Sequence, residues 1–361
     1  MARIFNFSAG PCTLPLPVLE KARDEFVDYQ GKGMSLVEMS HRGKVYEEVH
    51  NQAVALFQEL LGLPANYKVL FLGGGATLQF GMVPMNFLWG GKACDFTVTG
   101  TWAKKACEDA KKVGNVNVLY DGKADNYLNL PDPKSLKVTP GAAYLHMTSN
   151  ETIGGVQWQD WPETGDVPLF CDMSSDFMSR RFPVEKFSLI YAGAQKNVGP
   201  AGCAVVILRE ELLERCPPSI VAYLDYRAHV KENSLYNTPP VFAIWLIKLT
   251  MEWLKAQGGL PAAEKLAAER SGILYDAIER SAGFYTCPVP KAARSRMNVV
   301  FRLKTEELDA KFLEEAKKLK LDGLKGHRSV GGCRASIYNA MPVEGAKALA
   351  QLMDDFAKQN G

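Results

Sequence analysis

Between residues 68 and 210, short apolar runs alternate with segments that have helical spacing, and this alternation constrains the fold more than any other feature. Seven runs rich in Val, Ile, Leu, Phe and Tyr have the length and composition of strands. They cover residues 69–72, 96–98, 116–120, 142–147, 167–171, 189–192 and 203–208. Helical segments at 76–88 and 102–113 follow the first two runs. We therefore predict an α/β fold with a mostly parallel seven-stranded sheet flanked by helices, and ligands beyond the carboxyl ends of its strands.

The chain after residue 240 is organised differently. An apolar helical segment starts after Pro239–Pro240 and stops at Gly258–Gly259, and a long helix is expected from 261 towards 280. A strand at 298–303, a helix at 306–320, a strand at 334–338 and an amphipathic helix at 343–358 follow. We predict a large domain at 16–260 and a smaller α+β domain at 261–361, with segment 1–15 packing near the active site.

Composition argues against several classes of partner. Lys and Arg total 42 against 40 Asp and Glu, so no broad electrostatic attraction to nucleic acid or anionic lipid is expected. No apolar stretch is long enough to span a membrane, and no signal peptide is visible. Eight cysteines are scattered without a C-x-x-C pair, so we expect reduced thiols, a cytoplasmic location and no metal site.

A glycine-rich turn follows the first predicted strand, in the sequence VLFLGGGAT at 69–77. Glycines let a backbone approach an anion closely, and the free N–H groups of a first helical turn point at it. The turn can therefore hold a phosphate. It does not match G-x-G-x-x-G, because Leu78 stands where the third glycine belongs, and a plain tight connection explains it equally well.

Two charged residues stand at the ends of later strands. Asp172 ends the run LFCD, where a buried carboxylate needs a cation or hydrogen-bond donors; capping of the turn into Ser174–Ser175 is the alternative. Lys196 lies among small residues in YAGAQKNVGPAG. Apolar walls would lower its pKa and free the amine for a Schiff base with an aldehyde, whereas a surface lysine in a glycine-rich loop is the alternative.

Together these features supply what pyridoxal phosphate requires. The glycine turn can hold its phosphate, Asp172 can hold a protonated ring nitrogen, and Lys196 can bond to its aldehyde. Trp102 adds a flat apolar face that could stack on the ring, although a tryptophan of the core is an equally good interpretation.

Nine stretches of the chain resemble the phosphoserine aminotransferase family of fold-type I pyridoxal-phosphate transferases. They extend from Phe5 almost to the C-terminus and read FNFSAGP, EMSHRGK, NYKVLFLGGG, SNETIGGVQ, CDMSS, YAGAQKNVGPAG, LYNTPP, RSRMN and LKGHRSVGGCRASIYNAMP. The resemblance implies the fold-type I fold, pyridoxal 5'-phosphate as cofactor, and a homodimer with shared active sites.

The resemblance also implies roles for individual residues. Lys196 would bond covalently to the cofactor and move the proton, and Asp172 would pair with the ring nitrogen. Trp102 would stack on the ring, and Thr152 would lie near its phenolic oxygen. The phosphate would be held by Ala76, Thr77 and Gln195 of one subunit and by Asn237 and Thr238 of its neighbour.

Basic residues gather in two stretches that contain Gly and Ser, and not on helical faces. They are His41 and Arg42 in the first stretch, and His327, Arg328 and Arg334 in the second. Arginine binds carboxylate or phosphate through paired hydrogen bonds, so such clusters suit a substrate with two anionic ends. The resemblance assigns Arg334 to the α-carboxylate and the other four to the side-chain carboxylate or phosphate. From the residues alone, solvated turns are the alternative.

The implied reaction is the amino-transfer step of serine biosynthesis. L-Glutamate and 3-phosphohydroxypyruvate would give 2-oxoglutarate and O-phospho-L-serine, reversibly. The family also accepts 4-phosphohydroxy-L-threonine, in pyridoxine biosynthesis, and the residues leave that activity open. The alternatives are another fold-type I aminotransferase of the serine or alanine–glyoxylate type, a pyridoxal-phosphate protein without turnover, and a nicotinamide dehydrogenase with a similar sheet.

Two positions depart from the family pattern. Many relatives carry serine where this chain has Ala9, and many bacterial relatives carry arginine where it has Thr77. The missing arginine removes one phosphate contact, and the basic residues that remain are expected to suffice for binding.

Overall fold

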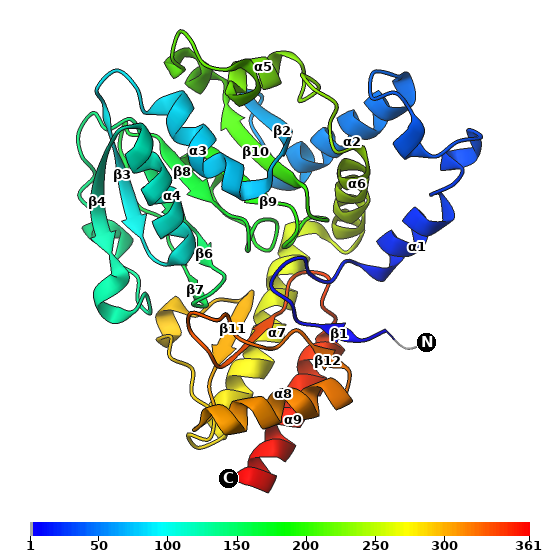
Figure 1. Ribbon diagram of the computed structural model, residues 1–361, viewed down its shortest axis with the longest axis vertical. Coiled ribbons are helices and arrows are strands. Elements are labelled where there is room, and N and C mark those ends of the chain that lie inside the picture. The colour runs from blue at the N-terminus through cyan, green and yellow to red at the C-terminus, as the bar shows by residue number, and fades with distance from the viewer. Residues whose placement is uncertain (1–2) are drawn as a thin grey trace.

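A computed structural model describes residues 3–361, and its largest element is a twisted seven-stranded sheet (Figure 1). Its spatial order is β2 (Tyr67–Gly73), β10 (Cys203–Arg209), β9 (Phe187–Gly193), β8 (Leu169–Asp172), β5 (Leu145–Thr148), β3 (Ala93–Val98) and β4 (Asn115–Asp121). All neighbours pair in parallel except β10, which is antiparallel to both β2 and β9. The prediction of a mostly parallel seven-stranded sheet is confirmed.

Helices cover both faces of this sheet. Alternate residues of β2 point to opposite sides: Val69 and Phe71 belong to a core shared with α2 (Lys44–Leu61) and α6 (Val241–Ala256). Leu70 and Leu72 belong to a core shared with α3 (Gly75–Phe87) and α4 (Thr101–Val113). Burial on both faces explains why the strands read as continuous apolar runs in the sequence.

A second, smaller core lies in the C-terminal part of the chain. It is built around α7 (Gly259–Arg280), β11 (Asn298–Phe301), α8 (Glu306–Lys318), β12 (Leu321–Asp322), β13 (Cys333–Ser336) and α9 (Val343–Asn360). The start of the chain joins this region, because β1 (Phe5–Asn6) pairs in parallel with β12 and Phe7 is buried in the same core (Figure 1).

Helix α7 links the two regions. Leu260 and Ala263, near its start, pack in the core of the large sheet, whereas Leu274 and Ala277 pack in the smaller core. The boundary expected at 260/261 therefore falls within a continuous helix, and the division into domains at that point stays a prediction.

Most element bounds agree with the sequence patterns to within a few residues. One difference is β5, which begins at Leu145 and not at 142. Residues 141–144 form a turn and a short irregular stretch that leads into the strand. Among residues 3–361, every helix is too short or too polar to cross a bilayer.

Candidate active site

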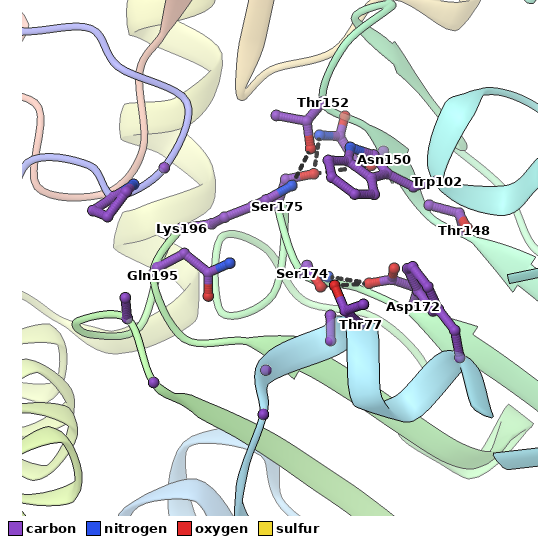
Figure 2. Close-up of a pocket in the computed structure, with 18 residues that line it drawn as sticks. Thr77, Trp102, Thr148, Asn150, Thr152, Asp172, Ser174, Ser175, Gln195 and Lys196 are labelled. Atoms are coloured by element: carbon purple, nitrogen blue, oxygen red, sulfur yellow. Dashed lines mark hydrogen bonds between the residues drawn. The ribbon is translucent and has the colours of Figure 1, made fainter. Parts of the chain in front are cut away.

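A cavity of about 320 Å³ lies at the carboxyl ends of β2, β5, β8 and β9 (Figure 2). This is the edge of the sheet where the strand pattern predicted a ligand. The cavity also receives two residues from the N-terminal segment, Gly10 and Pro11. Its other walls come from strand ends, from the turns beside them and from the first turns of α3 and α4: Gly74, Gly75, Ala76, Thr77, Phe80, Trp102, Thr148, Asn150, Thr152, Asp172, Ser174, Ser175, Gln195, Lys196, Ala201 and Gly202.

The glycine turn brings the start of α3 to the cavity. Gly74 has a φ of 87°, which L side chains rarely adopt, and a Cβ there would lie 2.8 Å from the Cβ of Leu78. Only glycine therefore allows the chain to turn directly from β2 into α3. Ala76 and Thr77 then line the cavity from the first helical turn, whose N–H groups have no partner within the helix.

Asp172 lies at the end of β8 and is 4% exposed. Its Oδ1 accepts hydrogen bonds from the backbone N–H (2.9 Å) and the hydroxyl (2.6 Å) of Ser174. The capping alternative is therefore also present, in the same side chain. Burial raises the pKa of Asp172, although the Ser174 donors and Lys196 act in the opposite direction. A cationic ligand atom beside Asp172 would favour its ionised form.

Lys196 extends into the cavity from the turn after β9 and is 8% exposed. Its Nζ donates to Oγ1 of Thr152 and lies 5.0 Å from the centroid of the Trp102 ring (Figure 2). Burial lowers the pKa of Lys196 to about 8, although the nearby carboxylates of Asp172 and Glu151 raise it. A far larger fraction of the amine is therefore neutral at neutral pH than in an ordinary lysine, and the neutral amine is the state that attacks an aldehyde.

Glu151, which the sequence analysis did not single out, holds the start of α4. Its carboxylate accepts the backbone N–H groups of Trp102 (3.1 Å) and Ala103 (2.9 Å). Burial raises the pKa of Glu151 to about 7. The bond to the backbone N–H of Trp102 holds the helix start that carries the indole, which lies beside Lys196 and packs against the apolar core. Stacking of the indole on a cofactor ring stays a prediction.

Arg334 is the predicted basic residue whose charge acts on the reactive amine, lowering the pKa of Lys196. Its Nη1 donates to the backbone carbonyl of Thr152 (3.2 Å), and its Nε is buried with no hydrogen-bond partner in residues 3–361. His327 is nearby, since burial and the charges of Arg334, Arg328 and Lys105 all lower its pKa. The second basic stretch thus places positive charge beside the cavity.

Seven predicted residues do not line the cavity of their own chain: the three of the second basic stretch, His327, Arg328 and Arg334, and four from elsewhere in the chain. His41 and Arg42 lie in the turn before α2, and Asn237 and Thr238 are exposed in the loop before α6. The other predicted cofactor residues, Ala76, Thr77, Trp102, Thr152, Asp172, Gln195 and Lys196, do meet there.

Several polar residues of the cavity were missed by the sequence analysis. Asn150 donates to the hydroxyl of Ser175 (2.7 Å), and Thr148 ends β5 with its hydroxyl buried and without a partner in residues 3–361. All of them follow strands of the parallel sheet. A search of every polar residue at or just after the carboxyl end of a predicted strand would have found them.

The residues present fit pyridoxal phosphate. A helix start can hold a phosphate, Asp172 can hold a cationic nitrogen, and Lys196 can bond to an aldehyde. Buried polar atoms without partners in the described chain, Oγ1 of Thr148 and Nε1 of Trp102, belong to residues that line the same cavity. An aromatic face and a volume of about 320 Å³ suit a small planar ligand.

Comparison with known proteins decides between the classes of enzyme considered above. The family model for class-V aminotransferases matches residues 4–349. The chain belongs to this family. It is therefore a pyridoxal-phosphate-dependent aminotransferase with the fold-type I architecture, as predicted. The dehydrogenase alternative is wrong.

Similar proteins carry a common name. The chain is 50% identical to phosphoserine aminotransferase of Niallia circulans, over 99% of both chains. The solved phosphoserine aminotransferase of Bacillus circulans subsp. alkalophilus has a TM-score of 0.98 and 50% identity, covering 99% of each chain. A pyridoxal-phosphate-bound phosphoserine aminotransferase from Trichomonas vaginalis has a TM-score of 0.90 and 40% identity, covering 98% of this chain and 100% of that one.

Proposed function

We propose that this aminotransferase moves an amino group reversibly between L-glutamate and 3-phosphohydroxypyruvate, giving O-phospho-L-serine and 2-oxoglutarate. The names of relatives that match nearly the whole chain at about 50% identity support this reaction. So does the chemistry of the cavity, which combines a neutral amine, a buried carboxylate and adjacent positive charge.

The place of Arg334 is the observation that carries the proposal. Its guanidinium bonds to the backbone of Thr152, whose hydroxyl accepts from Nζ of Lys196. A carboxylate on Arg334 would therefore sit close to the reactive amine, as the α-carboxylate of an amino acid must. The buried N–H at Nε of Arg334 has no hydrogen-bond partner in residues 3–361 and can donate to that carboxylate.

The protein's own residues account for the proton transfers. Pyridoxal phosphate, when bound, supplies an aldehyde for the amine and a ring that withdraws electrons from bonds at Cα. Lys196 would take the Cα proton with its neutral Nζ and later return it. Asp172 would keep a proton on the ring nitrogen of the cofactor, and Trp102 would offer the ring a flat apolar face. The start of α3, with Ala76, Thr77 and Gln195, would hold the phosphate.

The second anionic group of the substrate needs further positive charge. His327 and Arg328 would supply it beside Arg334, and we propose that His41 and Arg42 come from a second copy of the chain. Asn237 and Thr238 would reach the cofactor phosphate in the same way. Neither pair lines the cavity of its own chain, whereas Arg334 contacts Thr152 of that cavity and its charge acts on His327; this difference supports a homodimer with shared sites.

Exposed apolar side chains mark the surface that a second copy would cover. They lie in two segments that flank these residues, Phe26, Val27, Met34 and Val37 in one and Tyr236 and Phe242 in the other. The two segments meet where the rings of Phe26 and Phe242 pack edge to face, with centroids 5.8 Å apart. We call these six residues the apolar dimer surface.

A reducing compartment, the cytoplasm, suits the cysteines, all eight of which are unpaired. Activity on 4-phosphohydroxy-L-threonine stays a prediction. Ala9 and Thr77 bear on substrate affinity: Thr77 lines the cavity, and the carbonyl of Ala9 accepts from the hydroxyl of Tyr338 (2.7 Å).

The proposal is tested by half-reactions followed through the cofactor's visible spectrum. Phosphoserine and glutamate should each convert the cofactor to its aminated form, and alanine and serine should do so far more weakly. Arg328→Ala and Arg42→Ala should weaken the half-reaction with phosphoserine much more than the half-reaction with alanine. If serine and phosphoserine converted the cofactor equally well, the proposal of a phosphorylated substrate would be contradicted. The protein would then be an aminotransferase of the serine type.

A further inference from the structure

A second cavity, of about 420 Å³, lies away from the active site. It is open to solvent on one side and is bordered by the N-terminal segment, the end of α6, the middle of α7 and the turn that leads into α9. Much of its wall is apolar, including Ile4, Leu16, Trp253, Leu266 and Met341. No residue of this wall also lines the cavity that contains Lys196.

One residue of the wall, Arg270 of α7, carries a buried positive charge. Its side chain is 1% exposed, and its Nη1 donates to the backbone carbonyls of Asn339 (3.1 Å) and Met341 (2.8 Å). Its Nε and Nη2 are buried and have no hydrogen-bond partner in residues 3–361. Within that same range Arg270 forms no ion pair. Burial lowers the pKa of Arg270 to about 10, so it is still charged at neutral pH.

A buried guanidinium without a counter-ion is unfavourable by several kcal/mol, so a compensating anion is expected. The unpartnered Nε and Nη2 form one edge of the guanidinium, the edge that binds a carboxylate through two parallel hydrogen bonds. The apolar walls and a volume of about 420 Å³ leave room for much more than an inorganic ion.

We propose that this cavity binds a small organic anion: a carboxylate or similar group on Arg270, with an apolar body against Trp253 and Leu266. The site is separate from the aminotransferase reaction. Asn339 stands between the two, because its carbonyl accepts from Arg270 and its backbone N–H donates to Oδ1 of Asn197, which follows Lys196 (2.9 Å).

The probe for this site is 1-anilinonaphthalene-8-sulfonate, an anion with an apolar aromatic body whose fluorescence rises in apolar surroundings. Titration into the holoenzyme should show saturable binding of one probe per chain. Excess glutamate or phosphoserine should not displace it, because those substrates occupy the other cavity. A carboxylate such as 4-phenylbutyrate should compete with it.

Two variants test the role of Arg270. Arg270→Met removes the charge. Leu266→Glu adds a carboxylate one helical turn before Arg270, at the spacing that favours an ion pair, and so supplies the counter-ion from the protein. Each should raise the Kd of the probe by about tenfold or more, because a charge-assisted hydrogen bond between Arg270 and the anion is lost.

The matched control is Lys265→Met, because Lys265 is exposed on the same helix and its loss changes the net charge by the same amount. It should bind the probe like the parent. If Arg270→Met does not fold, Leu266→Glu alone decides the test. No saturable binding, displacement by the substrates, or unchanged affinity in Leu266→Glu would each overturn the proposal.

Discussion

At the scale of single residues, the reactivity of Lys196 depends on burial more than on any one neighbour. Burial lowers the pKa of its amine to about 8, against the opposing effect of Asp172 and Glu151. Arg334 adds a smaller effect in the same direction as burial. The cavity therefore combines negative charge, which suits the cofactor's ring nitrogen, with an amine that loses its proton near neutral pH.

This balance predicts how the cofactor-free protein captures pyridoxal phosphate. Below pH 8 Lys196 is mostly cationic and unreactive, and above it mostly neutral, so the capture rate should rise with a midpoint near pH 8. Glu151→Gln removes a charge that raises this pKa, so its midpoint should be lower. Stopped-flow absorbance measures the rates. Glu108→Gln, an exposed change on α4, is the control and should leave the midpoint in place.

Asp172 gives a second prediction at this scale. Asp172→Asn should keep the cofactor bound to Lys196 but lose about a thousandfold in turnover, because a neutral ring draws electrons poorly and proton transfer to and from Cα slows. Borohydride reduction with mass spectrometry measures the covalent bond, and the half-reaction with glutamate measures turnover. Asp166→Asn, at an exposed loop position, should behave like the parent. An Asp172→Asn protein as fast as the parent would remove the proposed role.

At the scale of elements, the strands could be predicted because their apolar runs are buried on both faces of the sheet. Their order could not, since periodicity says nothing about which strand lies beside which. The reversed direction of β10 between β2 and β9 was equally invisible, because its run of Val, Ile and Leu resembles those of its parallel neighbours.

The same reasoning separates the found site residues from the missed ones. Asp172 and Lys196 stand at the ends of long apolar runs and were therefore noticed. Glu151 and Asn150 belong to β6 (Asn150–Glu151), a two-residue strand paired with β7 (Val156–Gln157), which is too short to produce a pattern. The contact of Glu151 with the start of α4 joins residues far apart in the chain, so it cannot be recognised before the fold is known.

That contact leads to a prediction about Gly100, the residue before α4. A Cβ at Gly100 would lie 2.3 Å from the carboxylate carbon of Glu151, while its extended backbone would accept any residue. Gly100→Ala should therefore push Glu151 off the helix start and lower the free energy of unfolding by about 1–3 kcal/mol. Weaker cofactor binding should accompany the loss, because Trp102 follows on the same turn.

Gly272→Ala is the matched control for this change. Gly272 lies inside α7 with open space where a Cβ would stand, so the same substitution should raise stability by about 0.5–1 kcal/mol. Urea denaturation of the holoenzyme measures both variants. Equal effects of the two substitutions would mean that the close approach to Glu151 is not what constrains Gly100.

At the scale of the whole molecule, the N-terminal segment connects the parts that surround the active site. Phe7 is buried in the smaller core, Gly10 and Pro11 line the cavity, and Cys12 contacts the backbone of Lys196. A movement of one core relative to the other would therefore change the position of Lys196. The remaining wall, with Arg42 and Asn237, is expected from a second copy through the apolar dimer surface.

Shared active sites can be tested by mixing two inactive proteins. Lys196→Ala keeps Arg42 but lacks the amine, and Arg42→Ala keeps the amine but lacks the guanidinium for the second anion. If Arg42 acts across the dimer, a hybrid dimer contains one site with both residues intact and one site with neither. After unfolding and refolding a one-to-one mixture, about a quarter of the parent's activity on phosphoserine should return, since half the dimers are hybrids.

The control mixture combines Lys196→Ala with Arg334→Ala. Arg334 contacts Thr152 of its own chain, beside Lys196, so the two defects should fall in different sites of a hybrid dimer. They would fall in the same site, and leave the other site intact, only if Arg334 served the partner. Because Lys196 and Arg334 serve the same site from the same chain, one site of each hybrid lacks the amine and the other lacks the guanidinium of Arg334, so neither site is intact. That mixture should recover no activity beyond its Arg334→Ala component. Recovery in the control, or none in the Arg42 mixture, would contradict the assignment of Arg42 to the neighbouring subunit.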